Sequence, residues 1–180
     1  MTFRGSRRGA GRLSGLVNNA GITGGFQRVE TVTSELLTEV FAINVIGAFL
    51  CCREAVKRMS LRHGGSGGSI VNVSSRAAQL GGSGEWVHYA ASKGAIDSLT
   101  IGLAREVAGE GIRVNALSPG LIATGIHAAA GDPDRANRLA KTIPLGRAGK
   151  AEDVSAAVVW LMSPAAAYIT GAIVPVSGGR

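Results

Sequence analysis

Four short apolar segments alternate with helix-length segments along the chain, and this alternation limits the folds open to it. The apolar segments cover residues 13–17, 70–73, 112–117 and 172–176. Between them, apolar residues recur at helical spacing at residues 34–59, 89–108 and 151–162. Strands separated by helices favour a parallel sheet with helices on both faces. We therefore expect an α/β fold, a Rossmann-like doubly wound parallel sheet.

The length and the apolar content fit one domain. The chain has 180 residues, of which 46% are apolar, and this is enough to bury a substantial core. We expect no membrane-spanning segment, because no uninterrupted apolar stretch reaches the roughly 18 residues that a span needs. We also expect no secretory signal after Met1. The two cysteines, Cys51 and Cys52, are adjacent and lie among apolar residues, which predicts reduced thiols in a cytoplasmic protein.

The positive charge is concentrated at the start of the chain. The formal net charge is +7, and four arginines lie among the first twelve residues with no acid between them. Aromatic residues make up only 4% of the chain, which leaves few side chains for stacking on bases. We therefore expect no nucleic-acid partner. Residues 1–12 are predicted to form a disordered basic leader, and residues 13–180 are predicted to form the folded domain.

A tyrosine and a lysine four residues apart carry the strongest chemical signal. On a helix, Tyr89 and Lys93 share one face. A free tyrosine titrates near pH ~10, too high for efficient proton transfer at neutral pH, and a neighbouring ammonium lowers that pKa. The helix N-terminus, expected close to Tyr89, acts in the same direction. Such a pair can exchange a proton with an alcohol or carbonyl oxygen; the alternative is a chance pair on a solvated face.

Other polar residues are expected at the same end of the sheet. Ser75 follows a strand, where its hydroxyl can hydrogen-bond the same substrate oxygen; the alternative is a simple strand-end turn. Asn44 lies among apolar residues, and a buried amide needs partners. It either holds a water behind Lys93 or is a satisfied structural amide. Turns follow the first and third strands, at residues 18–21 and 119–124, and ligands of parallel sheets bind outside such carboxyl ends.

Together, these motifs resemble those of the short-chain dehydrogenases/reductases. The matching residues follow that family's order and rough spacing: Asn18-Asn19-Ala20-Gly21, Asn44, Ser75, Tyr89-x-x-x-Lys93 and Pro119-Gly120-x-x-x-Thr124. Tyr168-Ile169-Thr170-Gly171 and Val176-Ser177-Gly178-Gly179 resemble the family's C-terminal end. The resemblance covers the chain from about Gly11 onward. It implies an NAD(P)-dependent hydride transfer between a secondary alcohol and a ketone.

The resemblance also implies catalytic roles for four residues. Tyr89 would be the general acid/base, and Lys93 would lower its pKa and contact the nicotinamide ribose. Ser75 would orient the substrate carbonyl, and Asn44 would hold a proton-relay water.

A second set of residues would bind the cofactor, NAD or NADP, by the same resemblance. Tyr89 and Lys93 belong to this set together with two turns. Residues on the adenosine side would be Asn19, Ala20 and Gly21. Residues beside the nicotinamide would be Pro119, Gly120, Ile122 and Thr124.

The three histidines match no role in the family. His63, His88 and His127 are too far apart in sequence to suggest a metal site, and we expect none. They are predicted to lie on the surface or in loops. His88, which precedes Tyr89, is also a candidate for the substrate pocket.

The chain departs from the family on its N-terminal side. Family members begin with a strand, a Gly-rich turn and a helix that receives the cofactor pyrophosphate. Gly5-x-x-x-Gly9-x-Gly11 reproduces the glycine spacing, but no strand precedes it and no helix can follow it. We therefore expect an N-terminally truncated domain, the C-terminal two-thirds of the family's fold, lacking its first strands and Gly-rich turn. The first remaining strand would then be an open edge.

Two functions from different classes are compatible with these features. The first is an oxidoreductase acting on a small carbonyl or alcohol substrate. The second is a non-catalytic truncated remnant that serves only as an oligomerising or binding module. In either case, the resemblance to dimeric and tetrameric proteins implies a homodimer or homotetramer assembled through the two long helices.

Overall fold

A parallel sheet of four strands organises the protein. The computed structural model describes residues 11–180, so the expected leader lies outside the described residues apart from its last two positions, as do Gly5 and Gly9. The strands are β1 (Gly15–Asn18), β2 (Gly68–Val73), β3 (Ile112–Pro119) and β4 (Ile173–Val176), in the spatial order β1-β2-β3-β4. All three pairings are parallel, which confirms the α/β fold class. Within the described residues β1 is an edge strand, as expected.

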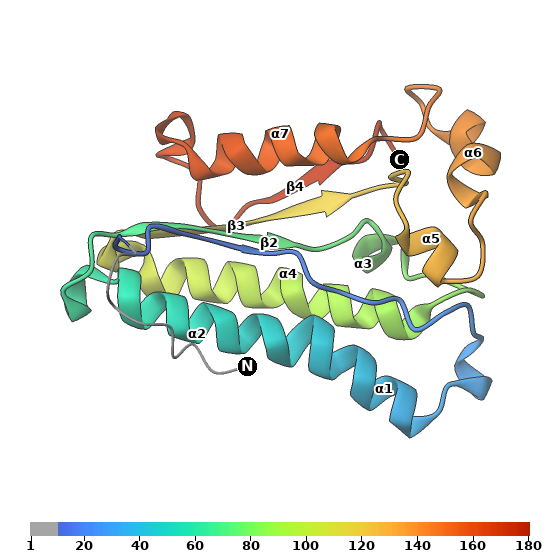
Figure 1. Ribbon diagram of the computed structural model, residues 1–180, viewed down its shortest axis with the longest axis horizontal. Helices are drawn as coiled ribbons and strands as arrows, with labels where there is room; N and C mark the ends of the chain where they lie inside the picture. Colours follow the sequence, from blue (N-terminus) through green and yellow to red (C-terminus); the bar gives the residue numbers. More distant parts are fainter. Residues whose placement is uncertain (1–10) are drawn as a thin grey trace.

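Helices cover both faces of this sheet (Figure 1). The segment predicted as one helix at 34–59 consists of α1 (Ser34–Phe41), a π-helical segment (Ala42–Ile46) and α2 (Gly47–Met59), which follow one another without a break. This segment and α4 (Val87–Val107) lie against one face, and α7 (Ala151–Met162) lies against the other. The Thr33 side chain begins α1 by accepting a hydrogen bond from the backbone N–H of Leu36.

Residues 126–142, called the lid below, form a series of short helical turns. It contains α5 (Ile126–Ala129) and α6 (Arg135–Leu139), followed by a 3-10 turn. Leu121, Ala136 and Ile143 form a small apolar cluster of their own beneath this lid. The lid therefore has its own anchoring core and covers the carboxyl end of the sheet. One more short helix, α3 (Ala77–Leu80), follows β2 at the same end (Figure 1).

Successive residues of β2 supply the two halves of the main core. Ile70 packs into the cluster formed with α2 and α4, whereas Val71 packs against Leu117 and Leu161 on the α7 side. Both β2 side chains are fully buried. Alternate residues of a strand point to opposite faces, so a strand covered on both sides buries successive residues.

Replacing Leu161 with alanine should destabilise the α7 half of this core. Leu161 is fully buried, and its truncation removes buried methyl groups and leaves a cavity, at a cost of about 3 kcal/mol in the free energy of unfolding. Val159→Ala on the same helix is the matched control, because Val159 is 68% exposed and should cost less than about 0.5 kcal/mol. Urea unfolding followed by circular dichroism measures both. Equal losses in the two variants would contradict this packing.

One helix meets the length and composition criteria for a membrane span, although the sequence analysis expected no such segment. Among the described residues, the continuous helix Ser34–Met59 is 26 residues long and apolar enough, by length and composition, to cross a membrane. The expectation required an uninterrupted apolar run and therefore passed over a helix containing scattered polar residues. In the structure this helix contacts β1 and α4. The core helix of a folded domain meets the same criteria of length and composition.

Candidate active site

A cavity of 580 Å³ opens at the carboxyl end of the sheet. It is lined by side chains from the ends of β1, β2 and β3 and from the first two turns of α4. Its size is within the usual range for a small-molecule site. Ser75, Tyr89 and Lys93 all line it. The fold therefore brings together three of the four residues that the sequence analysis placed in catalysis.

Tyr89 is the third residue of α4 and is largely buried, with 7% of its surface exposed. Burial raises its pKa, and a hydrogen bond with Ser75 lowers it. The net shift is upward because burial dominates, opposite to the net lowering that the sequence analysis expected. Lys93 Nζ lies 5.7 Å from the centre of the tyrosine ring and donates a 2.8 Å hydrogen bond to the carbonyl of Val73.

Lys93 lies one helical turn after Tyr89 and is also buried. Burial lowers its pKa to about 8, and the carboxylate of Asp97, one turn further along α4, opposes that shift. Lys93 is therefore mostly an ammonium at neutral pH. Its hydrogen bond to Val73 fixes this cation at the end of β2, within reach of the cavity.

Backbone pairing beyond the end of β2 fixes Ser75. The backbone N–H of Ser74 donates to the carbonyl of Leu117, and that of Arg76 donates to the carbonyl of Pro119. The Ser75 hydroxyl also accepts a 3.1 Å hydrogen bond from the backbone of Ala77. Ser75 thus lies in an ordered turn at the end of the strand, and its hydroxyl faces Tyr89.

Asn44 is buried behind the cavity rather than in its wall. It lies in the π-helical segment, a distortion that often accompanies functional sites. Its Oδ1 accepts from the backbone N–H of Ile22, and its Nδ2 donates to the Ile22 carbonyl and to the Ser92 hydroxyl, at 2.8 to 3.0 Å. These contacts tie the turn after β1 to α4. A Cβ at Gly21 in that turn would lie 3.2 Å from Asn44 Oδ1 and 3.3 Å from Lys93 Nζ, which explains the absence of a side chain there.

Asn44→Ala should loosen the turn that Asn44 holds. The change leaves the partly buried N–H and C=O of Ile22 without their partners, so we expect a loss of about 2 kcal/mol in the free energy of unfolding. Thr38→Ala is the control, because Thr38 is an exposed residue of the same helix that bonds only one backbone carbonyl. Urea unfolding compares the two. An Asn44→Ala variant as stable as the control would show that the amide does not support the turn.

The proposed cofactor residues meet around the same cavity with one exception. Its lining includes Asn19, Gly21, Pro119, Gly120, Ile122 and Thr124. Ala20 is exposed and does not line it. The lining residues fit the nicotinamide and ribose end of a dinucleotide: small backbone turns, hydroxyl groups and one buried cation. A Gly-rich phosphate turn between a strand and a helix is not found among residues 11–180.

Two histidines lie elsewhere than predicted. His88 and His127 are buried, and each places Nε2 2.9 Å from a backbone carbonyl, that of Thr23 and that of Ile122 respectively. His88 is not among the residues that line the cavity, although it was suggested for the substrate pocket, whereas His127 does line it. A cluster of metal-ligating side chains is not found in the described part of the chain.

Trp86 is a cavity residue that the sequence analysis did not identify. Its ring packs against Tyr89, with 5.6 Å between ring centres, and stacks on Phe26 at 4.7 Å. The available signal was its spacing, since a position three residues before Tyr89 lies on the same helical face.

Comparison with known proteins identifies the family. A family model described as enoyl-(acyl carrier protein) reductase matches residues 2–180. The uncharacterised oxidoreductase YgfF of Escherichia coli is 56% identical over 168 residues, which cover 93% of this chain and 68% of that protein. The chain belongs to the short-chain dehydrogenase/reductase family. The resemblance inferred from the motifs is thereby confirmed.

Other members of the short-chain dehydrogenase/reductase family match over similar lengths. A 3-oxoacyl-[acyl-carrier-protein] reductase of Bos taurus is 41% identical over 179 residues, covering 99% of this chain and 70% of that protein. A galactitol 2-dehydrogenase (L-tagatose-forming) of Cereibacter sphaeroides is 39% identical over 169 residues, covering 93% of this chain and 65% of that protein. This chain therefore spans about two thirds of the length of such relatives, and these relatives are oxidoreductases with different substrates.

Proposed function

We propose that the protein is an NAD(P)-dependent oxidoreductase that interconverts a secondary alcohol and a ketone. One observation carries the proposal: the hydroxyls of Tyr89 and Ser75 face each other beside the buried Lys93, in the wall of a cavity at the carboxyl end of a parallel sheet. Two hydroxyls at one point in a cavity can bind a single carbonyl oxygen. The membership of the family, whose other members named above are oxidoreductases, supports the same conclusion.

The chain's own residues supply the proton and the orientation of the substrate. The Ser75 hydroxyl donates a hydrogen bond to the carbonyl oxygen, and Tyr89 donates its proton to that oxygen as the alcohol forms. In the reverse direction Tyr89 takes the proton from the alcohol. The Lys93 ammonium stabilises the tyrosinate left after the proton has moved.

The turns around the cavity are proposed to hold the nicotinamide end of the cofactor. Lys93 would contact the ribose, and Pro119, Gly120, Ile122 and Thr124 would lie beside the ring. The bound cofactor supplies the hydride. Asn19 and Gly21 would lie toward the adenosine side, and Ala20 would take part through its backbone. Asn44 would hold the turn after β1 in place. Asn44 is also proposed to hold a proton-relay water behind Lys93.

We also propose that the protein is a cytoplasmic homo-oligomer with no nucleic-acid or membrane partner. Cys51 and Cys52 are free, and burial raises the pKa of the Cys52 thiol to about 11, which fits an unreactive thiol in a reducing compartment. Ile46, Phe49 and Leu50 are each more than 40% exposed on the long helix. Exposed apolar side chains grouped on one element are typical of a protein–protein interface.

Titration of NADH and NADPH against the purified chain tests the proposal. We expect saturable binding in the micromolar range by nicotinamide fluorescence, together with turnover of a ketone. Gly21→Ala should weaken binding several-fold, because its Cβ would press on Lys93, while Gly102→Ala should not, because a Cβ there meets open space. A chain that fails to saturate at millimolar concentrations of either cofactor would contradict the proposal and favour the non-catalytic module.

A further inference from the structure

A second cavity joins the first one at the catalytic hydroxyls. It has a volume of 390 Å³ and lies on the other side of Ser75 and Trp86, between α3, the loop before α4 and the lid. Ser75, Trp86 and Gly120 line both cavities. A substrate whose carbonyl oxygen is held by Ser75 and Tyr89 can therefore extend the rest of its length into this second space.

The second cavity is basic. Arg76, Arg135 and Arg180 line it, and Glu85 is the single acidic side chain among the described residues that form its wall. His127 also lines it, but burial lowers the pKa of that ring, so it adds no positive charge at neutral pH. Glu85 and the main-chain carboxylate of Arg180, the last residue of the chain, offset two of the three guanidinium charges and leave a net charge of +1 in the wall. Uncompensated cations in a cleft attract anions.

Arg135 is built into this wall rather than free on the surface. Its side chain is 6% exposed, and its Nη2 donates to Glu85 Oε2 at 2.5 Å. The guanidinium also lies over two aromatic rings, 4.9 Å from that of Trp86 and 5.1 Å from that of Phe26. Its Nε is buried and has no acceptor among the described residues. A guanidinium held this firmly loses little freedom when it binds an oxyanion.

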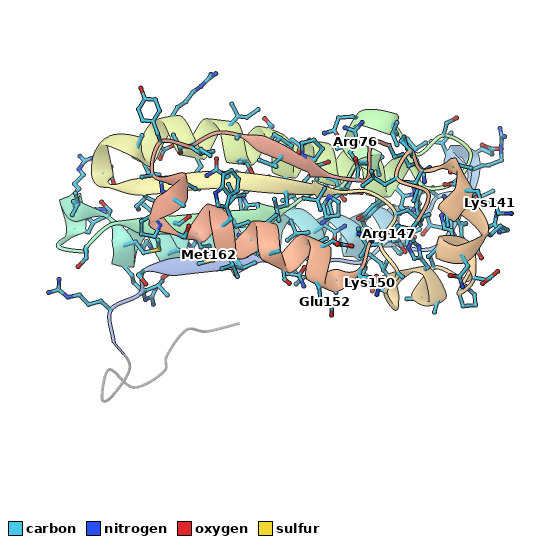
Figure 2. The ribbon with its side chains drawn as sticks, turned by 90° about the horizontal axis from the view of Figure 1, so that it is seen from above. Arg76, Lys141, Arg147, Lys150, Glu152 and Met162 are labelled. Carbon is cyan, nitrogen blue, oxygen red and sulfur yellow. The ribbon has the colours of Figure 1, made fainter. Side chains whose placement is uncertain are left out.

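Arg76 is fixed on the opposite side of the cavity, directly after the catalytic serine. Its Nε donates at 2.8 Å to a main-chain carboxylate oxygen of Arg180, and its Nη1 donates to Gln79 at 3.1 Å. Figure 2 shows Arg76 at the same end of the molecule as Lys141, Arg147 and Lys150. Those three do not line the cavity, and Arg147 is paired with Asp153. The basic wall is thus distinct from the general positive charge of this end.

We propose that this second cavity binds the anionic end of the substrate, so that the substrate is an oxo acid or its hydroxy-acid counterpart. The proposal rests on the proposed function for the position of the carbonyl. Arg76 and Arg135 are specificity-determining residues in it. They bind the oxyanion and so hold the carbonyl against Ser75 and Tyr89.

Fluorescence of Trp86 measures this binding without any cofactor. The chain has two tryptophans, so a Trp160→Phe background leaves Trp86, in the cavity wall, as the reporter. The probes are acetoacetate, levulinate and oxohexanoate, each compared with its methyl ester, which keeps the carbonyl and loses the charge. We expect at least one acid to bind about tenfold or more tightly than its ester, the gain expected of a charge-assisted hydrogen bond.

Variants that each remove one positive charge distinguish the arginines of the cavity from the other cations at this end of the molecule. Arg76→Gln and Arg135→Gln should each reduce the preference for the acid to less than threefold, and Lys141→Gln should leave it unchanged. Circular dichroism checks that each variant is folded, and Arg76→Gln keeps the proposal testable if Arg135→Gln disturbs the lid. Equal binding of acids and esters, no binding of either, or an equal loss in Lys141→Gln would overturn the anion site. Because no cofactor is present, these outcomes are independent of whether the chain binds NAD(P).

Discussion

Tyr89→Phe should abolish ketone turnover while the protein stays folded. The change removes one hydroxyl and almost no volume, so the packing of this ring against Trp86 remains. It removes the proposed proton donor, and general acid–base catalysis contributes about a hundredfold to ten-thousandfold to a rate. We expect turnover with either nicotinamide cofactor to fall by at least about a hundredfold, measured as the change in nicotinamide absorbance.

The control for this variant is Tyr168→Phe. Tyr168 is fully exposed and far from the cavity lining, so the same chemical change there should leave turnover unaltered. Cofactor fluorescence shows whether Tyr89→Phe still binds the nicotinamide. A Tyr89→Phe variant with more than a tenth of the normal rate would remove Tyr89 from the acid/base role.

Lys93→Met should also eliminate most turnover, by a different route. Methionine keeps the length of the buried chain and loses the ammonium that stabilises the tyrosinate and donates to Val73. We expect a rate loss of at least about a hundredfold. Any residual rate should require a higher pH, because Tyr89 then ionises without a neighbouring cation while burial raises its pKa. An unchanged rate and pH profile would contradict the role of Lys93.

The same substitution has a predictable effect on stability. The folded chain releases the Lys93 proton near pH 8, whereas the unfolded chain keeps it up to the ordinary pKa of 10.5. The unfolded state therefore binds more protons in this window, and the free energy of unfolding rises with pH, by about 2 kcal/mol from pH ~8 to pH ~9.5. Lys93→Met should lose this rise, and Lys57→Met, at an exposed lysine, should keep it. Urea unfolding across this range compares the three proteins.

The elements that sequence predicted well are those with strong local signals. Each strand joins an apolar run to a turn of Asn, Ser, Pro or Gly, and the order of strands follows from the helices between them. The close approach of Ser75 to Tyr89 was also predictable, because the carboxyl ends of neighbouring parallel strands meet at one edge. These features depend on short-range patterns that a single sequence contains.

The features that were missed depend on packing between distant segments. The π-helical turn around Asn44 reflects its bonds to Ile22 and Ser92, which no local pattern contains. The burial of His88 and His127 depends on carbonyls of other loops. The pKa of Tyr89 depends on how deeply the ring is buried, which the spacing from Lys93 alone does not contain.

Hydride transfer itself is the most direct test of this account. The protein is incubated with NADH or NADPH deuterated at the reactive ring carbon, together with a ketone acid such as levulinate, and the hydroxy acid is examined by mass spectrometry. The account predicts one deuterium in the product from a single face of the ring, and none with Tyr89→Phe. A folded protein that saturates with the cofactor and forms no labelled alcohol from any ketone offered would contradict it.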